Sequence, residues 1–178
     1  MKQRLERLYL PEFVYGGIDG SVTTFAVVAG AIGASLSAGI VLILGFANLF
    51  ADGFSMALSN YLSVKSQGDL HRYHRDKNKN TEAKHPFKTG LATFLSFVVI
   101  GFIPLVSFVL ALFFSSLEPY KLTISIVFTG LAFLFVGAVK GKIVKKHPFY
   151  AAIETLIIGG IAASLAFAVG YFLRGLAG

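Results

Sequence analysis

The stretch that decides the fold runs from Gly16 to Gln67 and reads GGIDGSVTTFAVVAGAIGASLSAGIVLILGFANLFADGFSMALSNYLSVKSQ. Its first half is apolar and contains one charged residue, Asp19. Its second half carries potential ligands at four-residue intervals, a spacing that places them on one face of a helix: Asn48, Asp52, Met56 and Asn60. Ionisable side chains within an apolar span are costly and usually face a bundle interior or an ion pathway. The stretch therefore predicts a membrane transporter of a metal cation.

The composition is that of a membrane protein. Hydrophobic residues make up 55% of the 178 residues, the mean hydropathy is +0.72, and 14% of the residues are charged, whereas a soluble domain has about 25% charged residues. No linker of different composition divides the chain, so we expect a single transmembrane domain over residues 1–178. The sequence lacks cysteine, which excludes disulfides, thiolate zinc sites and iron–sulfur clusters, and we expect no cofactor.

Five segments are long and apolar enough to cross a hydrocarbon core of roughly 30 Å. They are residues 13–34, 39–64, 89–117, 122–139 and 149–173. Pro104 is expected to kink the third of them. Residues 65–88 are polar and are predicted to form a short basic cytoplasmic loop, and the N-terminal residues are predicted to form a surface helix that Pro11 ends. The predicted fold class is an all-α polytopic membrane protein with five transmembrane helices.

The distribution of Lys and Arg predicts the orientation. Of these 16 residues, all but Lys121 and Arg174 lie in the N-terminal segment, in residues 65–88, or between the fourth and fifth spans. The positive-inside rule then places the N-terminus in the cytoplasm and, with five spans, the C-terminus outside. The same distribution explains the net charge of +7 without a nucleic acid partner.

Small residues recur at every fourth position on the first two spans, where they would allow helices to approach closely in lipid. The two stripes are Ala26, Gly30 and Ala34, and Ala47, Ala51, Ser55 and Ser59. Five helices are few for enclosing a pathway. We therefore expect a homodimer that completes it, with the stripes at or near the interface.

The ligand types narrow the choice of cation. At about 1.5 Å per residue, Asp19 and Met56 lie roughly 9 and 12 Å below the cytoplasmic surface, so they can meet at one level. Asp52 and then Asn48 continue the ladder of ligands toward the outer side. Carboxylate and amide oxygens combined with a thioether fit Fe(II) or Mn(II), and protons should compete with the metal for Asp19.

Each of these residues also has a structural interpretation. Asp19 could cap the first helix, and Met56 could simply pack. Asn48 and Asn60 could form interhelical hydrogen bonds. Glu154 is predicted to interact favourably with the dipole of the fifth helix. The loop residues that could capture metal are predicted instead to belong to a solvated basic loop: Asp69, His71, His74 and Asp76.

Nearly the whole chain resembles the vacuolar iron transporter family. The resemblance rests on DGSVTTFAVVAGAIGA, LILGFANLFADGFSMALSNYLSVKSQ, HPFKTGLATFLSFVVIGFIP and IETLIIGGIAASLAFAVG. It implies a five-helix homodimer that moves Fe(II), and often Mn(II), out of the cytoplasm in exchange for protons, along a pathway between the protomers lined by their first two helices. The family's acid of the first helix falls on Asp19, and its Met of the second helix falls on Met56.

The sequence departs from the family pattern at two places. Plant and fungal relatives carry Glu in the second helix where this chain has Asn48, so either Asp52 supplies that charge or the site is less acidic. The relatives also insert a Glu-rich metal-binding domain between the second and third helices, where this chain has only residues 65–88, with Gln67 at a position where an acid is common.

The sequence thus predicts a transporter that moves Fe(II) or Mn(II) out of the cytoplasm in exchange for protons. The predicted metal ligands are Asp19, Met56, Asp52 and Asn48. The alternative is a non-transporting membrane protein whose polar stripe serves helix association. An enzyme is not expected, because no nucleophile and base are paired. The predicted location is the cell membrane of a prokaryote or a vacuolar-type membrane of a eukaryote.

Overall fold

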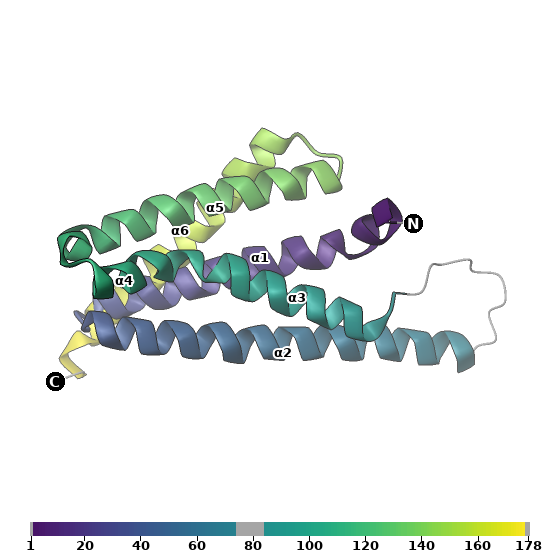
Figure 1. Cartoon of the computed structure of the whole chain (residues 1–178), viewed down its shortest axis with the longest axis horizontal. Helices are drawn as coiled ribbons and strands as arrows, with labels where there is room; N and C mark the ends of the chain where they lie inside the picture. The colour runs from purple at the N-terminus through teal and green to yellow at the C-terminus, as the bar shows by residue number, and fades with distance from the viewer. Residues whose placement is uncertain (1, 74–83, 177–178) are drawn as a thin grey trace.

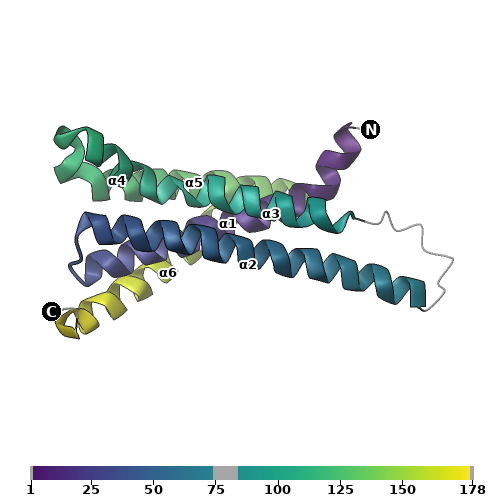
Figure 2. The same ribbon diagram turned by 60° about the horizontal axis from the view of Figure 1, so that its bottom comes forward.

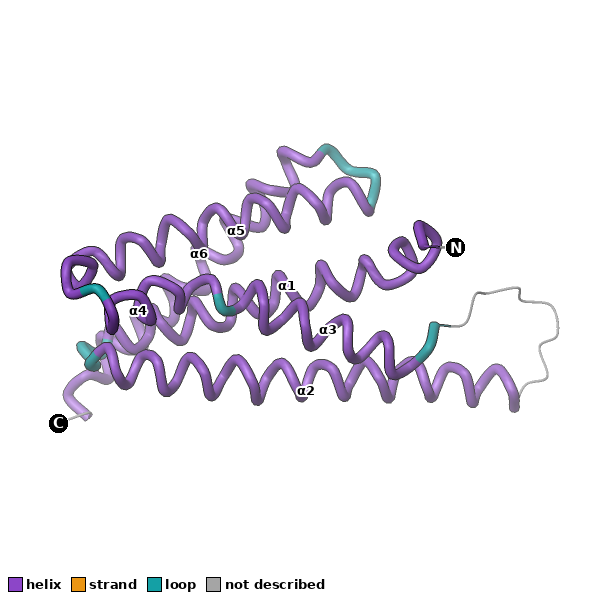
Figure 3. The backbone as a smooth tube through the Cα atoms, in the orientation of Figure 1, coloured by secondary structure: helices purple, strands orange, loops and turns teal. Residues whose placement is uncertain are grey.

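The computed structural model describes residues 2–73 and 84–176, which form helices joined by short turns (Figures 1 and 3). In chain order the elements are α1 (Lys2–Gly33), α2 (Ala38–Tyr73), α3 (Pro86–Gly101), α4 (Ile103–Phe113), the 3-10 helix η1 (Ser115–Tyr120), α5 (Lys121–Ile143), α6 (Pro148–Leu173) and the 3-10 helix η2 (Arg174–Leu176). The described residues contain no strand. The all-α prediction is confirmed.

Four helical segments are long and apolar enough to cross a membrane, and the described part of the chain has a fifth if α3 and α4 count as one broken span. The axes of α3 and α4 differ by 50°. Pro104 lies in the first turn of α4, where its ring and missing N–H prevent the helix from continuing straight. The Ser125 hydroxyl of α5 donates a hydrogen bond to the Pro104 carbonyl at 2.7 Å and so ties α5 to the bend. The predicted kink at Pro104 is confirmed.

Helix α1 lies at the centre of the bundle, and its most extensive contacts are with α3 and α6 (Figures 1 and 2). Where α1 crosses α3, the two backbones touch: a Cβ atom added at Gly101 would lie 2.8 Å from the Gly20 carbonyl oxygen. Small residues permit this approach, which matters in lipid because apolar burial does not drive helices together there.

The two small-residue stripes have different surroundings. A Cβ atom at Gly30 would lie 3.3 Å from the carbonyl oxygen of Ala166, so this part of the α1 stripe packs against α6 within the same protomer. On α2, by contrast, the whole stripe is exposed: Ala47, Ala51, Ser55 and Ser59. Of the two stripes predicted to lie at or near an interface, the α2 stripe is the one with a free surface.

The outside of the bundle is apolar. Large hydrophobic side chains are exposed along α2, α5 and α6, among them Phe54, Phe135 and Leu165, each more than 60% exposed. Helix α6 is the least buried of the candidate spans, although its mean hydropathy is high. Such a surface would be a liability in water, and a bilayer is the solvent that suits it.

Two helix ends differ from the sequence-based expectation. Helix α2 continues to Tyr73, whereas the second span was predicted to end at Val64 and residues 65–88 to form a loop. Pro11 lies inside α1 rather than ending a separate helix, although the N-terminal part points away from the rest of α1 (Figure 2). Hydropathy marks where a chain leaves the hydrocarbon, but a helix of polar residues can continue into water.

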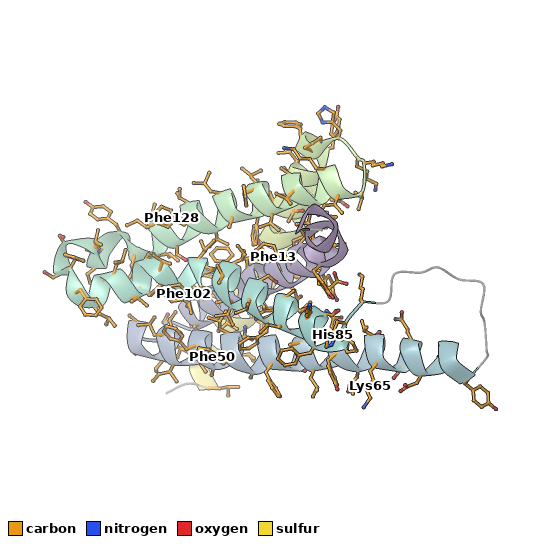
Figure 4. All side chains as sticks on the ribbon, turned by 45° about the vertical axis from the view of Figure 1, so that its right-hand side comes forward. Phe13, Phe50, Lys65, His85, Phe102 and Phe128 are labelled. Carbon is orange, nitrogen blue, oxygen red and sulfur yellow. The ribbon has the colours of Figure 1, made fainter. Side chains whose placement is uncertain are left out.

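Most basic residues in the described part of the chain lie at one end of the bundle. The N-terminus, the C-terminal end of α2, the start of α3 and the turn between α5 and α6 lie together, opposite the α1–α2 turn, η1 and the C-terminus (Figure 1). Figure 4 shows Lys65 and His85 toward the first end and Phe50 and Phe102 nearer the second. Since Lys140 and Lys142 end α5 at the first end, whereas Lys121 and Arg174 lie at the second, the positive charge is strongly one-sided.

Candidate cation site

Asp19 lies in the interior of α1, near the middle of a helix that begins at Lys2. The alternative that Asp19 caps this helix is therefore wrong, because a cap precedes the first turn. Its side chain is partly buried. The Thr23 hydroxyl donates to the backbone carbonyl of Asp19 at 2.8 Å, but in residues 2–73 and 84–176 no hydrogen bond or ion pair engages the Asp19 carboxylate. The carboxylate is left free to bind a cation.

Asp52 supplies the second carboxylate. It lies on the exposed side of α2, close enough to Asp19 for the two negative charges to interact. Two nearby carboxylates repel each other, and a divalent ion placed between them would remove that repulsion. The structure thus brings together an acid of the first span and an acid of the second.

Met56 and Asn48 lie one helical turn on either side of Asp52, and both are partly buried. The Asn48 side-chain nitrogen is buried without a hydrogen-bond partner among the described residues. An unsatisfied buried amide nitrogen is costly, so its position calls for a partner that the described residues do not provide. The predicted interhelical hydrogen bond is therefore not made by Asn48 within the described part of the protomer.

Asn60 has a different role from the other three members of the α2 ladder. Its side-chain amide donates to the Thr93 hydroxyl of α3 at 2.8 Å. Four residues turn a helix by 400°, so each step of the ladder moves 40° around the axis, and three steps carry Asn60 from the side of Asn48 toward α3. The prediction that Asn48, Asp52, Met56 and Asn60 share one face is therefore only approximate. The alternative that Asn60 forms an interhelical hydrogen bond is confirmed.

Replacing Asn60 with Leu should lower stability without weakening metal binding. The change removes the hydrogen bond to Thr93 and keeps a side chain of similar size, so we expect a loss of roughly 1 kcal/mol. Thermal unfolding in detergent measures the loss, and a metal titration measures the affinity. Ser59→Ala, a change on the exposed side of α2, is the matched control. A lower metal affinity in the Asn60→Leu variant would instead place Asn60 among the ligands.

Other acidic and imidazole groups do not form a metal centre in the described residues: no three His, Cys, Asp or Glu side chains lie together there. Asp69 is exposed on the last turns of α2, His74 and Asp76 lie outside the described residues, and of His71 only the helical backbone is described. Glu154 lies beyond the first turn of α6, so the predicted interaction with the helix dipole is wrong. Its exposed carboxylate pairs with Lys140 at 3.4 Å.

One acidic residue near the site was not predicted. Glu12 lies seven residues before Asp19, which puts both on the same side of α1, and its side chain is 12% exposed. The i, i+7 spacing of the two acids is the signal that could have indicated it. It was missed because Glu12 falls outside the first predicted span, in a segment interpreted as a surface helix.

The chain is similar in sequence to known proteins over most of its length. A family model described as VIT family matches residues 10–86 and 74–171. The chain is 28% identical to a vacuolar iron transporter of Plasmodium berghei, over 96% of this chain and 84% of that protein. It is 27% identical to a vacuolar iron transporter of Toxoplasma gondii, over 93% and 74% of the two chains. It is also 27% identical to vacuolar iron transporter 1 of Oryza sativa subsp. japonica, over 88% and 82%.

Proposed function

We infer the function of this chain from the fact that it belongs to the VIT family. We propose that it is a multi-pass membrane transporter that moves Fe(II), and also Mn(II), out of the cytoplasm. The observation that carries the proposal is that two acids of the apolar spans, the partly buried Asp19 of α1 and the exposed Asp52 of α2, lie within range of each other's charge. Relatives that bear the name vacuolar iron transporter, each about a quarter identical over most of the chain, support iron as the cargo.

The ligands explain why such an ion would be accepted. Asp19 and Asp52 supply two negative charges that match a divalent cation, and Met56 and Asn48 add a thioether and an amide oxygen from the adjacent turns of α2. A thioether favours Fe(II) over Mg(II), since hard ions bind oxygen ligands in preference to sulfur. Protons should compete with the metal for Asp19. We propose that this competition couples export of the metal to protons moving the other way.

The one-sided positive charge supports an orientation. The N-terminus, the end of α2 and the α5–α6 turn would lie in the cytoplasm, and the α1–α2 turn and the C-terminus outside. The membrane would be the cell membrane in a prokaryote or a vacuolar-type membrane in a eukaryote. In either case the ion leaves the cytoplasm.

A second copy of the chain would complete the pathway. Within the described residues one protomer brings only two carboxylates together, and Asp52 borders the exposed α2 stripe of Ala47, Ala51, Ser55 and Ser59. A symmetric dimer through that stripe would place the acids of both protomers near one axis. It would also offer a polar environment to the unpartnered amide of Asn48.

The family match supports a short form of the transporter, with few residues between α2 and α3. The two matched segments overlap at residues 74–86, where α2 has ended and α3 begins. The alignment with the Plasmodium berghei protein spans 229 positions, more than the 178 residues of this chain, so that relative carries additional residues within the aligned region. We propose that the cytoplasmic metal-binding domain of longer relatives is absent between α2 and α3, and that the chain transports without it.

The competing function is a membrane protein that conducts nothing and uses its polar stripe for helix association. The hydrogen bond from Asn60 to Thr93 favours this role for Asn60 alone. For Asp19 and Asp52 helix association is a poor explanation, because two carboxylates within range of each other's charge repel. The variants Asp19→Asn and Met56→Ala separate the two functions. If these residues line a pathway, the variants should lose transport but remain dimeric. If the residues serve helix association, the variants should lose the dimer.

The direct test is Fe(II) uptake into liposomes that carry the purified protein, under reducing and oxygen-free conditions, with Mn(II), Zn(II) and Mg(II) as competitors. Uptake is measured with and without a pH gradient, against protein-free liposomes. We expect Fe(II) uptake that Mn(II) inhibits, that Mg(II) leaves unchanged and that an opposing proton gradient accelerates. Absence of uptake for every divalent ion would overturn the transport proposal, and uptake that is insensitive to the gradient would overturn the coupling to protons.

A further inference from the structure

An ion pair joins α1 to the chain segment that leads into α3, at the end of the bundle where the basic residues gather. The Lys84 ammonium contacts one carboxylate oxygen of Glu12, Oε1. Next to it, the backbone N–H of His85 donates to the Tyr9 hydroxyl at 3.1 Å. Two successive residues, Lys84 and His85, are thus held against the first helix.

The Glu12 carboxylate is only half satisfied. Its second oxygen, Oε2, is buried and has no hydrogen-bond partner in the described residues. A buried anionic oxygen without a partner is costly, because it has lost water and gained nothing in return. The unpartnered Oε2 can therefore accept a second cation. A pair formed only to hold two segments together would not need such a free oxygen.

Glu12 also lies in line with the candidate cation site. It precedes Asp19 by seven residues, so the two side chains point to nearly the same side of α1 and are separated by about 10 Å along its axis. The N-terminal end of α1 lies at the basic end of the bundle (Figure 1), and Glu12 precedes Asp19 along this helix. A cation that approaches Asp19 along this side of α1 from that end meets Glu12 first.

We propose that Glu12 is the first carboxylate to bind the transported divalent cation, and that the Lys84 ammonium occupies this carboxylate until the cation displaces it. The inference rests on the proposed transport function. A divalent cation interacts more strongly with a carboxylate than an ammonium does, and it can use both oxygens, including the unpartnered Oε2. Lys is suited to withdraw, because its charge is carried on a flexible, rotatable stem.

A second ion pair at the same end provides a matched comparison. Lys140 pairs with Glu154 at 3.4 Å, and the two side chains are 34% and 50% exposed. Glu12 is more deeply buried, and it alone of these two acids has an orphaned oxygen in the described part of the chain. Replacing Lys140 or Lys84 removes one positive charge from the same end of the bundle. Of the two, Lys84 is the one paired with Glu12, which lies on the same side of α1 as Asp19.

The test compares five proteins in the full chain: wild type, Lys84→Gln, Glu12→Gln, the double variant and Lys140→Gln. Mn(II) is the probe, because its electron paramagnetic resonance signal reports binding in detergent, and its uptake into liposomes gives KM and kcat. Binding is measured separately from uptake. A wild-type protein that binds Mn(II) but does not transport it would contradict the proposed transport function, while the binding measurements would still test the role of Glu12.

We expect Lys84→Gln to lower the dissociation constant and KM for Mn(II) at least threefold, and Glu12→Gln to raise both at least threefold. The double variant should behave like Glu12→Gln, because Lys84 acts only through that carboxylate. Lys140→Gln should match wild type. The proposal would be overturned if Lys84→Gln and Lys140→Gln changed Mn(II) affinity equally, or if Lys84→Gln still changed it in the Glu12→Gln background. Either result would mean that Lys84 acts only through the general surface charge. If Glu12→Gln lowered thermal stability but left Mn(II) affinity unchanged, the Lys84–Glu12 ion pair would have only a structural role.

Discussion

Replacing Asp19 with Asn will greatly reduce Fe(II) uptake while leaving the helices folded. Asn has nearly the same shape, so the packing of α1 is retained, but the variant has lost the negative charge that faces Asp52. We expect uptake at limiting Fe(II) to fall roughly 100-fold, which corresponds to about 2.7 kcal/mol of lost binding. The measurement is Fe(II) uptake into liposomes, normalised to the amount of folded protein found by gel filtration.

Glu154→Gln is the matched control for this variant. It removes one carboxylate charge from an exposed acid whose partner is Lys140, well outside the α1–α2 pair. We expect it to keep wild-type uptake and wild-type thermal stability. The Asp19→Asn variant should unfold at the same temperature or higher, because one of two repelling charges has gone. Wild-type uptake by Asp19→Asn would show that Asp52 binds the ion without it, and the proposed site would then be wrong.

The fold could be predicted from the sequence wherever hydrophobicity decides it. The turn between the first two helices, the bend at Pro104 and the membrane class follow from runs of apolar residues and from a ring that cannot continue a helix. The end of α2 at Tyr73 could not be predicted in this way. Hydropathy changes at Lys65, but the backbone hydrogen bonds of a helix do not require an apolar environment.

The candidate site was less predictable, because periodicity locates a residue on its own helix without saying which neighbour it faces. The four-residue ladder on α2 identified Asp52 and Asn60 alike, yet Asp52 lies near Asp19 and Asn60 bonds to Thr93. The same holds for small residues: Gly30 packs against α6, whereas Ser55 is exposed. Both distinctions depend on tertiary contacts between helices far apart in the sequence, which no local pattern contains.

Placing large side chains on the exposed α2 stripe should separate the protomers and stop transport together. The double variant Ala51→Phe, Ser55→Phe adds two rings to a surface whose small residues would let two α2 helices approach closely. Neither ring should disturb the protomer, because both positions are exposed. We expect a monomer in detergent, by light scattering coupled to gel filtration, and at least a tenfold loss of Fe(II) uptake at limiting ion concentration, equivalent to about 1.4 kcal/mol.

The control is Gly160→Phe on α6, where an added Cβ atom would meet nothing within 4 Å. It adds a ring to another lipid-facing surface and should leave both the dimer and uptake intact. A double variant that is monomeric yet transports normally would show that one protomer encloses the whole pathway. A variant that stays dimeric would move the interface to another face. Joint loss is expected because the described part of one protomer contributes only two carboxylates to the proposed site, and a dimer through the α2 stripe would place the acids of both protomers near one axis.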